Sequence, residues 1–225
     1  MQANLLSTKE THTDERNLKR VLNAGSGSSA ARRLHPVFNG GAWREVRLDI
    51  DPLAKPDLVG SIADMSVLIE TQSFDAAWAS HSLEHLYLDE VRSALAEFRR
   101  ILKPTGFALI TSPDLETVSA LVVEHGLDHV AYEAAIGPIT AHDMIYGHGD
   151  SIRRGMTYMA HKSGFTCATM GSLLLKAGFP IVLAKRLGFD IWALALMEEA
   201  DKRSIQRELH ASGLNMFDDD DQEDA

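Results

Sequence analysis

The sequence has a single cysteine, no long apolar run and no excess of basic residues. Cys167 has no second cysteine to pair with, so an internal disulfide is excluded. No apolar stretch is long enough to cross a bilayer, and the first residues lack the pattern of a signal peptide. We therefore predict a soluble, cytoplasmic protein that does not act on membranes.

Acidic residues outnumber basic ones, with 32 Asp and Glu against 22 Lys and Arg and a formal net charge of −10. More than half of that charge comes from the acidic run at residues 218–224, which has the character of a solvated tail. No cluster of Lys and Arg is interleaved with aromatic residues, so a nucleic-acid substrate is disfavoured. A small molecule or a protein side chain fits better as the substrate. We expect a monomer or homodimer.

The chain is long enough, at 225 residues, to bury a core without disulfides or metal. Apolar residues make up 45% and charged residues 24% of it, as in ordinary globular proteins. We predict a flexible N-terminal arm at residues 1–17, one domain at residues 18–210 and an acidic tail at residues 211–225.

The most informative stretch runs from residue 20 to residue 34. A short apolar run ends in Gly25-Ser26-Gly27, and the residues from Ala30 onward can continue as a helix. Glycine allows the backbone to approach a ligand closely, and a helix N-terminus points its free N–H groups at the same place. The pattern predicts a nucleotide-type site, although an ordinary turn between a strand and a helix would have the same pattern.

Further strands are expected at residues 43–51, 57–62, 74–80 and 107–111, with helices at residues 89–101 and from residue 115. Strands separated by helices indicate a largely parallel sheet. Residues 181–187 and 189–197 are too close in sequence for a crossover, so they must form an antiparallel hairpin. Helices are also expected at residues 166–177 and 198–210.

Asp49 lies near the end of the second expected strand, a little over 20 residues after Gly27. In nucleotide-binding α/β folds, an acid at this point accepts hydrogen bonds from ribose hydroxyls. The alternative is that Asp49 and Asp51, which precede Pro52, only shape a turn.

Residues 125–162 form a less regular segment that contains half of the ten histidines. Glycines and a proline interrupt any helical or strand period there. Loops on a rigid α/β scaffold commonly select the substrate, and histidines titrate near neutral pH. We interpret this segment as an insertion that acts as a lid.

Four motifs follow one another along the chain: Val21-Leu22-Asn23-Ala24-Gly25-Ser26-Gly27, Leu48-Asp49-Ile50-Asp51-Pro52, residues 74–86 with Leu83-Glu84-His85, and Leu102-Lys103-Pro104-Thr105-Gly106. In this order they resemble the class I S-adenosylmethionine-dependent methyltransferases, and most closely their small-molecule, type-11-like group. The resemblance covers residues 20–113 by motif and extends to residue 197 by order of elements. It implies a Rossmann-like three-layer α/β sandwich whose seven-stranded, mostly parallel sheet ends in an antiparallel hairpin.

The resemblance also implies an activity and a cofactor site. The chain would transfer a methyl group from S-adenosyl-L-methionine to an oxygen or nitrogen of a small molecule, leaving S-adenosyl-L-homocysteine. Three positions depart from the family pattern, since Asn23, Ser29 and Ser61 stand where an acid, a glycine and an acid are usual. The implied cofactor-binding residues are Asn23, Gly25, Ser26, Gly27, Asp49, Ile50, Ser61, Ile62, Asp64 and Ser80.

Methyl transfer from a sulfonium requires alignment of the acceptor and, for an O–H or N–H group, removal of its proton. Histidine is a suitable base, and the candidates in falling order are His81, His148 and His142. Tyr146 and Arg153 are expected to bind the substrate because they lie in the insertion. No metal ligands are assigned.

Three other interpretations stay open at this point. Gly25, Gly27 and Ala30 also fit the fingerprint of NAD-dependent oxidoreductases, although no second substrate domain follows. Residues 81–85 match the His-x-x-Glu-His pattern of a zinc-protease group. Finally, the chain could be a regulatory or partner-binding module with a weakened cofactor site, which the missing acid at Asn23 would explain.

Overall fold

The computed structural model describes residues 18–29 and 34–217. The expected N-terminal arm, most of the helix expected after the glycine turn, and the acidic run lie outside these residues. No helix in the described ranges has the length and apolarity needed to span a bilayer.

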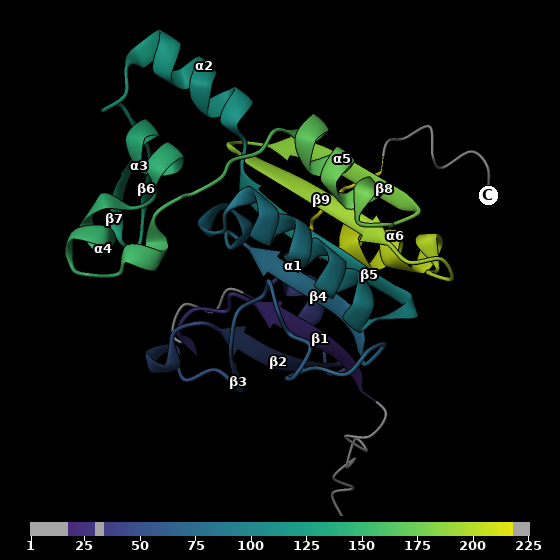
Figure 1. Ribbon diagram of the computed structural model, residues 1–225. Coiled ribbons are helices and arrows are strands. Elements are labelled where there is room, and N and C mark those ends of the chain that lie inside the picture. Colours follow the sequence, from purple (N-terminus) through teal and green to yellow (C-terminus); the bar gives the residue numbers. More distant parts are fainter. Residues whose placement is uncertain (1–17, 30–33, 218–225) are drawn as a thin grey trace, which may run out of the picture.

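A seven-stranded sheet forms the centre of the molecule, in the order β3-β2-β1-β4-β5-β9-β8 (Figure 1). Strands β1 to β5 are parallel to one another, whereas β9 runs antiparallel to both β5 and β8. This confirms the predicted Rossmann-like sheet and its terminal hairpin. The strands are β1 (Lys19–Ala24), β2 (Trp43–Asp49), β3 (Leu58–Val59), β4 (Phe74–Ser80), β5 (Leu102–Pro113), β8 (Ile181–Leu187) and β9 (Asp190–Leu196).

Apolar clusters cover both faces of the sheet. On the face turned toward the viewer in Figure 1, α1 (Leu88–Ile101) and α5 (Cys167–Lys176) bury Phe98 and Leu174 against the strands. On the opposite face, α6 (Lys202–Ala211) and the 3-10 helix η3 (Pro36–Phe38) pack around Trp78. The other short helices are η4 (Pro52–Ala54), η5 (Leu83–His85), α4 (Gly149–Arg153) and η6 (Thr157–Met159).

Several element boundaries differ from the predicted ones. Helix α1 begins at Leu88, one residue before the predicted start, and Glu90 accepts the backbone N–H of Tyr87 at 2.8 Å. Strand β3 is shorter than residues 57–62 because Gly60 closes it with a hydrogen bond to the Asp49 carbonyl. Strand β5 is longer than the predicted residues 107–111, because residues 102–106 and 112–113 also belong to it.

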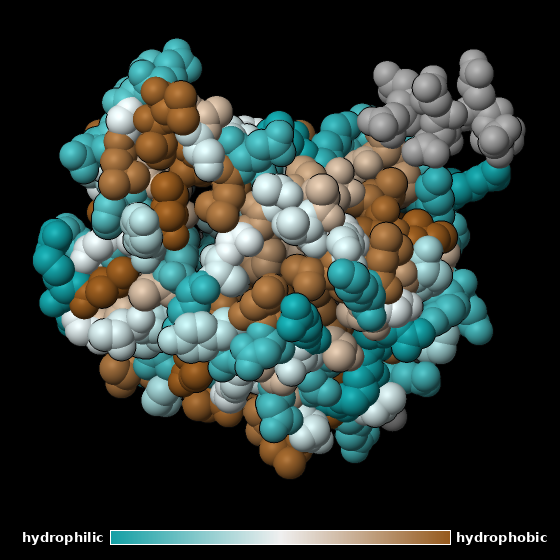
Figure 2. Space-filling view, turned by 45° about the horizontal axis from the view of Figure 1, so that its top comes forward, coloured by the Kyte–Doolittle hydropathy of each residue, from teal (hydrophilic) through white to brown (hydrophobic). Residues whose placement is uncertain are grey.

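Residues 125–162, here called the lobe, stand apart from the sheet at the upper left of Figure 1. They contain the hairpin of β6 (Val130–Ala134) and β7 (Gly137–Thr140), followed by α3 (Ala141–Tyr146). Buried Ile139, Ala141 and Met144 pack on Val118 of α2 (Leu115–His125), which gives the lobe its own small core. In the space-filling view, apolar side chains gather over this part of the molecule (Figure 2).

The end of the described chain is packed onto the sheet. Leu214, Met216 and Phe217 are buried in the same cluster as α6. Packed residues therefore continue past residue 211, the predicted start of the acidic tail.

Candidate functional site

A cavity of about 400 Å³ opens at the carboxyl ends of β1, β2 and β4. The strand order reverses between β1 and β4, and ligands of open α/β sheets bind at such a switch point. Its lining consists of Gly25, Gly27, Ser28, Asp49, Ile50, Asp51, Leu53, Ala54, Gly60, Ser61, Ile62, His81, Ser82, His85, Leu86, Glu90, Met156, Tyr158, Met159 and Lys162.

A larger cavity, of about 650 Å³, lies near the opposite ends of the strands, between Arg99, Leu102 and Met197. Leu102 is the first residue of β5, so this space is at the amino ends of the parallel strands. No glycine turn faces it, and its acids Glu198 and Glu199 follow the antiparallel strand β9, not a parallel strand. The smaller cavity is therefore the candidate site.

The glycine turn forms one wall of the candidate site. Gly25 has a φ of +73°, and a Cβ there would lie 2.6 Å from the Cβ of Ser82, so only glycine fits. The backbone N–H groups of Gly25 and Ser26 both donate to the Leu48 carbonyl, at 2.9 and 3.0 Å. The turn is thus fixed against the end of β2.

Asp49 is held in place beside this turn. Its Oδ2 accepts the N–H of Gly27 at 2.7 Å, and its Oδ1 accepts that of Asp51 at 2.9 Å. The Arg47 guanidinium donates to the carbonyls of Gly27, Ala54 and Lys55 and so ties the turn to the loop after β2. The carboxylate is therefore oriented before any ligand arrives, and each oxygen keeps a lone pair for it.

The lobe reaches the mouth of the cavity through Tyr158. The Tyr158 hydroxyl donates to Asp51 Oδ2 at 2.9 Å, and Met156 and Met159 on either side of it also line the cavity. This contact joins the lobe to the loop after β2 across the cavity. The interpretation of residues 125–162 as a lid stays a prediction.

His81 lies between two carboxylates where β4 ends. Its Nδ1 is 3.3 Å from Glu84 Oε1, and its Nε2 is 3.6 Å from Asp190 Oδ2. Burial alone would lower the pKa of His81, but these two acids outweigh it and raise the pKa to about 10. The imidazole is therefore protonated at neutral pH and is not free to accept a proton.

The surroundings of His81 also decide against the zinc-protease pattern. That pattern requires His81 and His85 on one face of a helix. Here η5 covers only Leu83–His85, and His81 precedes it with a left-handed φ of 48°. The two histidines do not share a helical face.

The structure brings most of the predicted cofactor residues together. Gly25, Gly27, Asp49, Ile50, Ser61 and Ile62 all line the cavity, as does His81. Four others lie outside its lining. Ser26 is buried, and Ser80 pairs with Thr111 in the sheet. Asp64 is exposed and accepts from Ser66, and Asn23 is buried and donates to Glu45 Oε1 at 2.7 Å.

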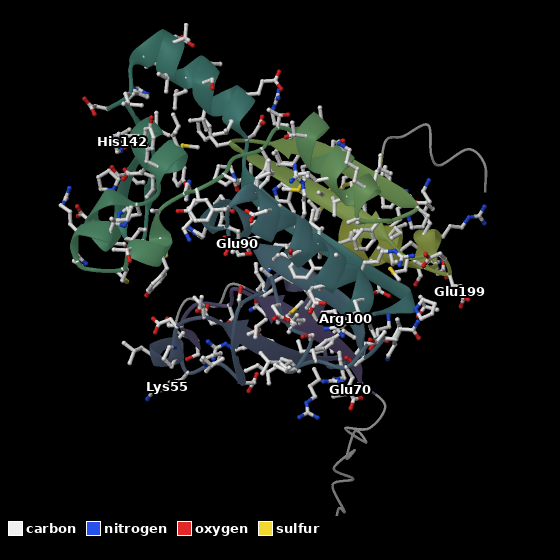
Figure 3. The ribbon with its side chains drawn as sticks, viewed as in Figure 1. Lys55, Glu70, Glu90, Arg100, His142 and Glu199 are labelled. Carbon is white, nitrogen blue, oxygen red and sulfur yellow. The ribbon has the colours of Figure 1, made fainter. Side chains whose placement is uncertain are left out.

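The remaining predicted residues belong to the lobe and do not line the cavity. His142 is exposed on α3. Figure 3 shows it in the lobe, away from Glu90, which lines the cavity at the start of α1. His148 Nδ1 is 2.8 Å from the Ser151 hydroxyl. Tyr146 is 54% exposed, and Arg153 pairs with Asp150 on α4.

Several lining residues were not among the predicted site residues. His85 stands inside the Leu-Glu-His motif, which could have indicated it. Tyr158 and Lys162 lie in the insertion without a local pattern that sets them apart, because their positions depend on how the lobe folds back.

Comparison with known proteins supports the class that these features indicate. Residues 22–110 match the family model described as a methyltransferase domain. The resemblance to the class I S-adenosylmethionine-dependent methyltransferases is thereby confirmed, and S-adenosylmethionine is the cofactor of that class. No curated protein sequence matches the chain significantly.

Solved structures share the fold at low sequence identity. A S-adenosylmethionine-dependent methyltransferase from Archaeoglobus fulgidus is 14% identical, with a TM-score of 0.55 over 80% of this chain and 86% of that one. The PH0226 protein from Pyrococcus horikoshii OT3 is 13% identical, with a TM-score of 0.52 over 82% and 84%. The trans-methyltransferase CalH, solved with S-adenosylhomocysteine, is 17% identical, with a TM-score of 0.52 over 80% and 52%.

Proposed function

We propose that this cavity binds S-adenosylmethionine and that the chain methylates an oxygen or nitrogen of a small molecule. The observation that carries the proposal is the pairing of the glycine turn with Asp49 at the carboxyl ends of β1 and β2. A carboxylate fixed beside a close-approach glycine turn matches the chemistry of a nucleoside that carries ribose hydroxyls.

Within this proposal, different lining residues contact different parts of the cofactor. Asp49 accepts hydrogen bonds from the ribose, and the turn at Gly25 and Gly27 packs against the methionine portion. Ile50, Ser61 and Ile62 surround the adenine. Asn23 acts indirectly. Its side-chain amide donates to Glu45, and this hydrogen bond positions β1, the strand that leads into the turn.

The acceptor is proposed to enter at the end of the cavity where His81 and Lys162 lie. The Lys162 ammonium group is a hydrogen-bond donor, so it favours an acceptor molecule that carries an anionic or carbonyl group. Both ring nitrogens of His81 face carboxylates, so His81 would line the path of the acceptor and would not deprotonate it. His142 and His148 stay predictions as bases, as do Tyr146 and Arg153 as substrate ligands.

Titration calorimetry with S-adenosylmethionine, S-adenosylhomocysteine and NAD tests the proposal directly. We expect the first two to bind with micromolar affinity and NAD not to bind. Binding of NAD alone would support the oxidoreductase interpretation. If none of the three binds, the cavity is not a cofactor site, and the partner-binding interpretation replaces this proposal. A cytoplasmic location and a monomeric or dimeric state stay predictions.

Tyr158→Phe removes the hydroxyl that joins the lobe to Asp51. Loss of one such bond costs about 1 kcal/mol, so we expect roughly fivefold faster release of bound S-adenosylhomocysteine. Stopped-flow displacement measures this rate. Tyr132→Phe is the matched control, since Tyr132 is also a partly exposed tyrosine of the lobe but lies outside the cavity lining. Equal rates for both variants would contradict a role for Tyr158 in closing the cavity.

A further inference from the structure

A carboxylate and two imidazoles meet beside the candidate cofactor cavity. One ligand atom from each of Glu84, His85 and His161 lies within 4.8 Å of the others. Glu84 and His85 belong to η5, and His161 lies where the lobe returns toward the sheet. The chain thus brings together three potential metal ligands from segments far apart in sequence.

Glu84 is buried, and only one of its two oxygens accepts a well-formed hydrogen bond. The residue is 1% exposed, and its Oε2 accepts the Ser112 hydroxyl at 3.0 Å. Within the described part of the chain, its Oε1 has no hydrogen-bond partner of good geometry, although His81 Nδ1 lies 3.3 Å away. Oε1 therefore has only a poorly aligned contact with His81 and keeps lone pairs with which it can bind a metal ion.

The two histidine rings are held as metal ligands usually are. His85 Nδ1 is 3.4 Å from the Ala160 carbonyl, and His161 Nδ1 is 3.0 Å from the Met144 carbonyl. A carbonyl oxygen only accepts, so each Nδ1 carries a proton and each Nε2 keeps its lone pair. Backbone carbonyls fix metal-binding histidines in this same tautomer.

Backbone hydrogen bonds hold the two segments together. The Glu84 carbonyl accepts the N–H of Lys162 at 2.8 Å, and the Tyr146 carbonyl accepts the N–H of His161 at 3.1 Å. The ring of His161 lies 4.9 Å from that of His85, measured between centroids. The cluster is therefore built by the fold and does not depend on chance contacts of exposed side chains.

We propose that Glu84, His85 and His161 bind one divalent transition-metal ion of the zinc type. Two imidazoles and one carboxylate suit Zn²⁺, Co²⁺, Ni²⁺ or Fe²⁺, whereas Mg²⁺ and Ca²⁺ prefer oxygen ligands alone. Such ions lie about 2.0–2.2 Å from nitrogen and oxygen ligands, so small rotations of the side chains would close the cluster.

Three protein ligands leave at least one coordination position for another donor. His85 also lines the candidate cofactor cavity, so this position is open toward the cavity. An oxygen or nitrogen of a small molecule could occupy it, and a bound ion lowers the pKa of such a group. This consequence rests on the proposed function, but the binding of the metal does not.

Metal titration of tag-free, chelator-treated protein tests the site without any cofactor. We expect one equivalent of Zn²⁺ to bind, and one equivalent of Co²⁺ to give the visible absorption of a low-symmetry site. His161→Gln and His85→Gln should each weaken Zn²⁺ binding by at least tenfold. His125→Gln is the matched control, because the rings of His125 and His129 also stack, at 4.4 Å, but lie outside the cluster.

Each outcome either supports or overturns the binding of a metal ion by this cluster. Failure of the wild-type protein to bind Zn²⁺ stoichiometrically would overturn the proposal, as would equal affinities of the wild type and both cluster variants. In those cases Glu84 serves only as the counter-ion of His81. Circular dichroism checks that the variants fold, and the two histidine variants are chosen because Glu84→Gln alters a buried charge. Binding of S-adenosylmethionine is measured separately, so the two proposals can fail independently.

Discussion

Asp49→Ala is expected to weaken the binding of S-adenosylmethionine by more than tenfold, with the fold intact. The proposed ribose bonds are made to a charged acceptor, and such bonds contribute about 1.5–3 kcal/mol each. The variant also frees the N–H of Gly27, which donates to Asp49 at 2.7 Å, so the glycine turn loses part of its orientation. Titration calorimetry of the variant and the wild type measures the difference.

Two further variants make this result specific. Asp49→Asn keeps the shape and one oxygen acceptor but removes the charge, so its affinity should fall between those of Asp49→Ala and the wild type. Asp128→Ala removes an exposed carboxylate of the lobe outside the cavity lining and should bind like the wild type. Equal binding by Asp49→Ala and the wild type would remove Asp49 from the cofactor site.

The second large effect concerns stability in acid and involves His35. This residue is 8% exposed, and its ring lies 5.4 Å from both Trp78 and Trp192, measured between centroids. Its Nδ1 accepts the N–H of Val37 at 3.3 Å, which requires the neutral ring. Burial lowers the pKa of His35 from 6.5 to about 4.

The folded state therefore binds this proton less readily than the unfolded state. The neutral His35 ring contributes fully to the free energy of unfolding above pH 6.5, and this contribution is lost as the pH falls toward 4. The loss amounts to about 3 kcal/mol. Urea unfolding of the wild type and of His35→Phe, at pH 7 and pH 4, isolates the effect from other titrating groups. A difference between the two proteins that does not change with pH would contradict it.

The sequence was most informative where contacts are local or repeat along the chain. The alternation of apolar strands and helices predicted the sheet, and the short connection at Gly188 required the antiparallel hairpin. Gly25, Gly27 and Asp49 were found because a strand, a turn and an acid at a strand end have a fixed spacing. Each of these features depends on backbone geometry over a few residues.

The sequence was least informative where segments distant in the chain meet. Tyr158 and Asp51 are 107 positions apart, and no local pattern joins them. His81 was predicted as a base because it follows β4, but Asp190 on β9 is one of the two acids that keep it protonated. Protonation depends on neighbours that only the folded chain supplies.

The attachment of the lobe has a consequence for how this protein could diversify. Asp114 and Phe165 pair with each other as neighbours in parallel orientation, so the chain leaves and re-enters the sheet domain at one point. Leu115 donates to the Phe165 carbonyl at 2.9 Å and closes this junction. The segment between the two residues can change in length without altering the distance that the sheet must bridge. Under the proposed function, a relative with the same sheet and glycine turn could acquire a new substrate by exchanging the part of this segment that lies outside the cavity lining.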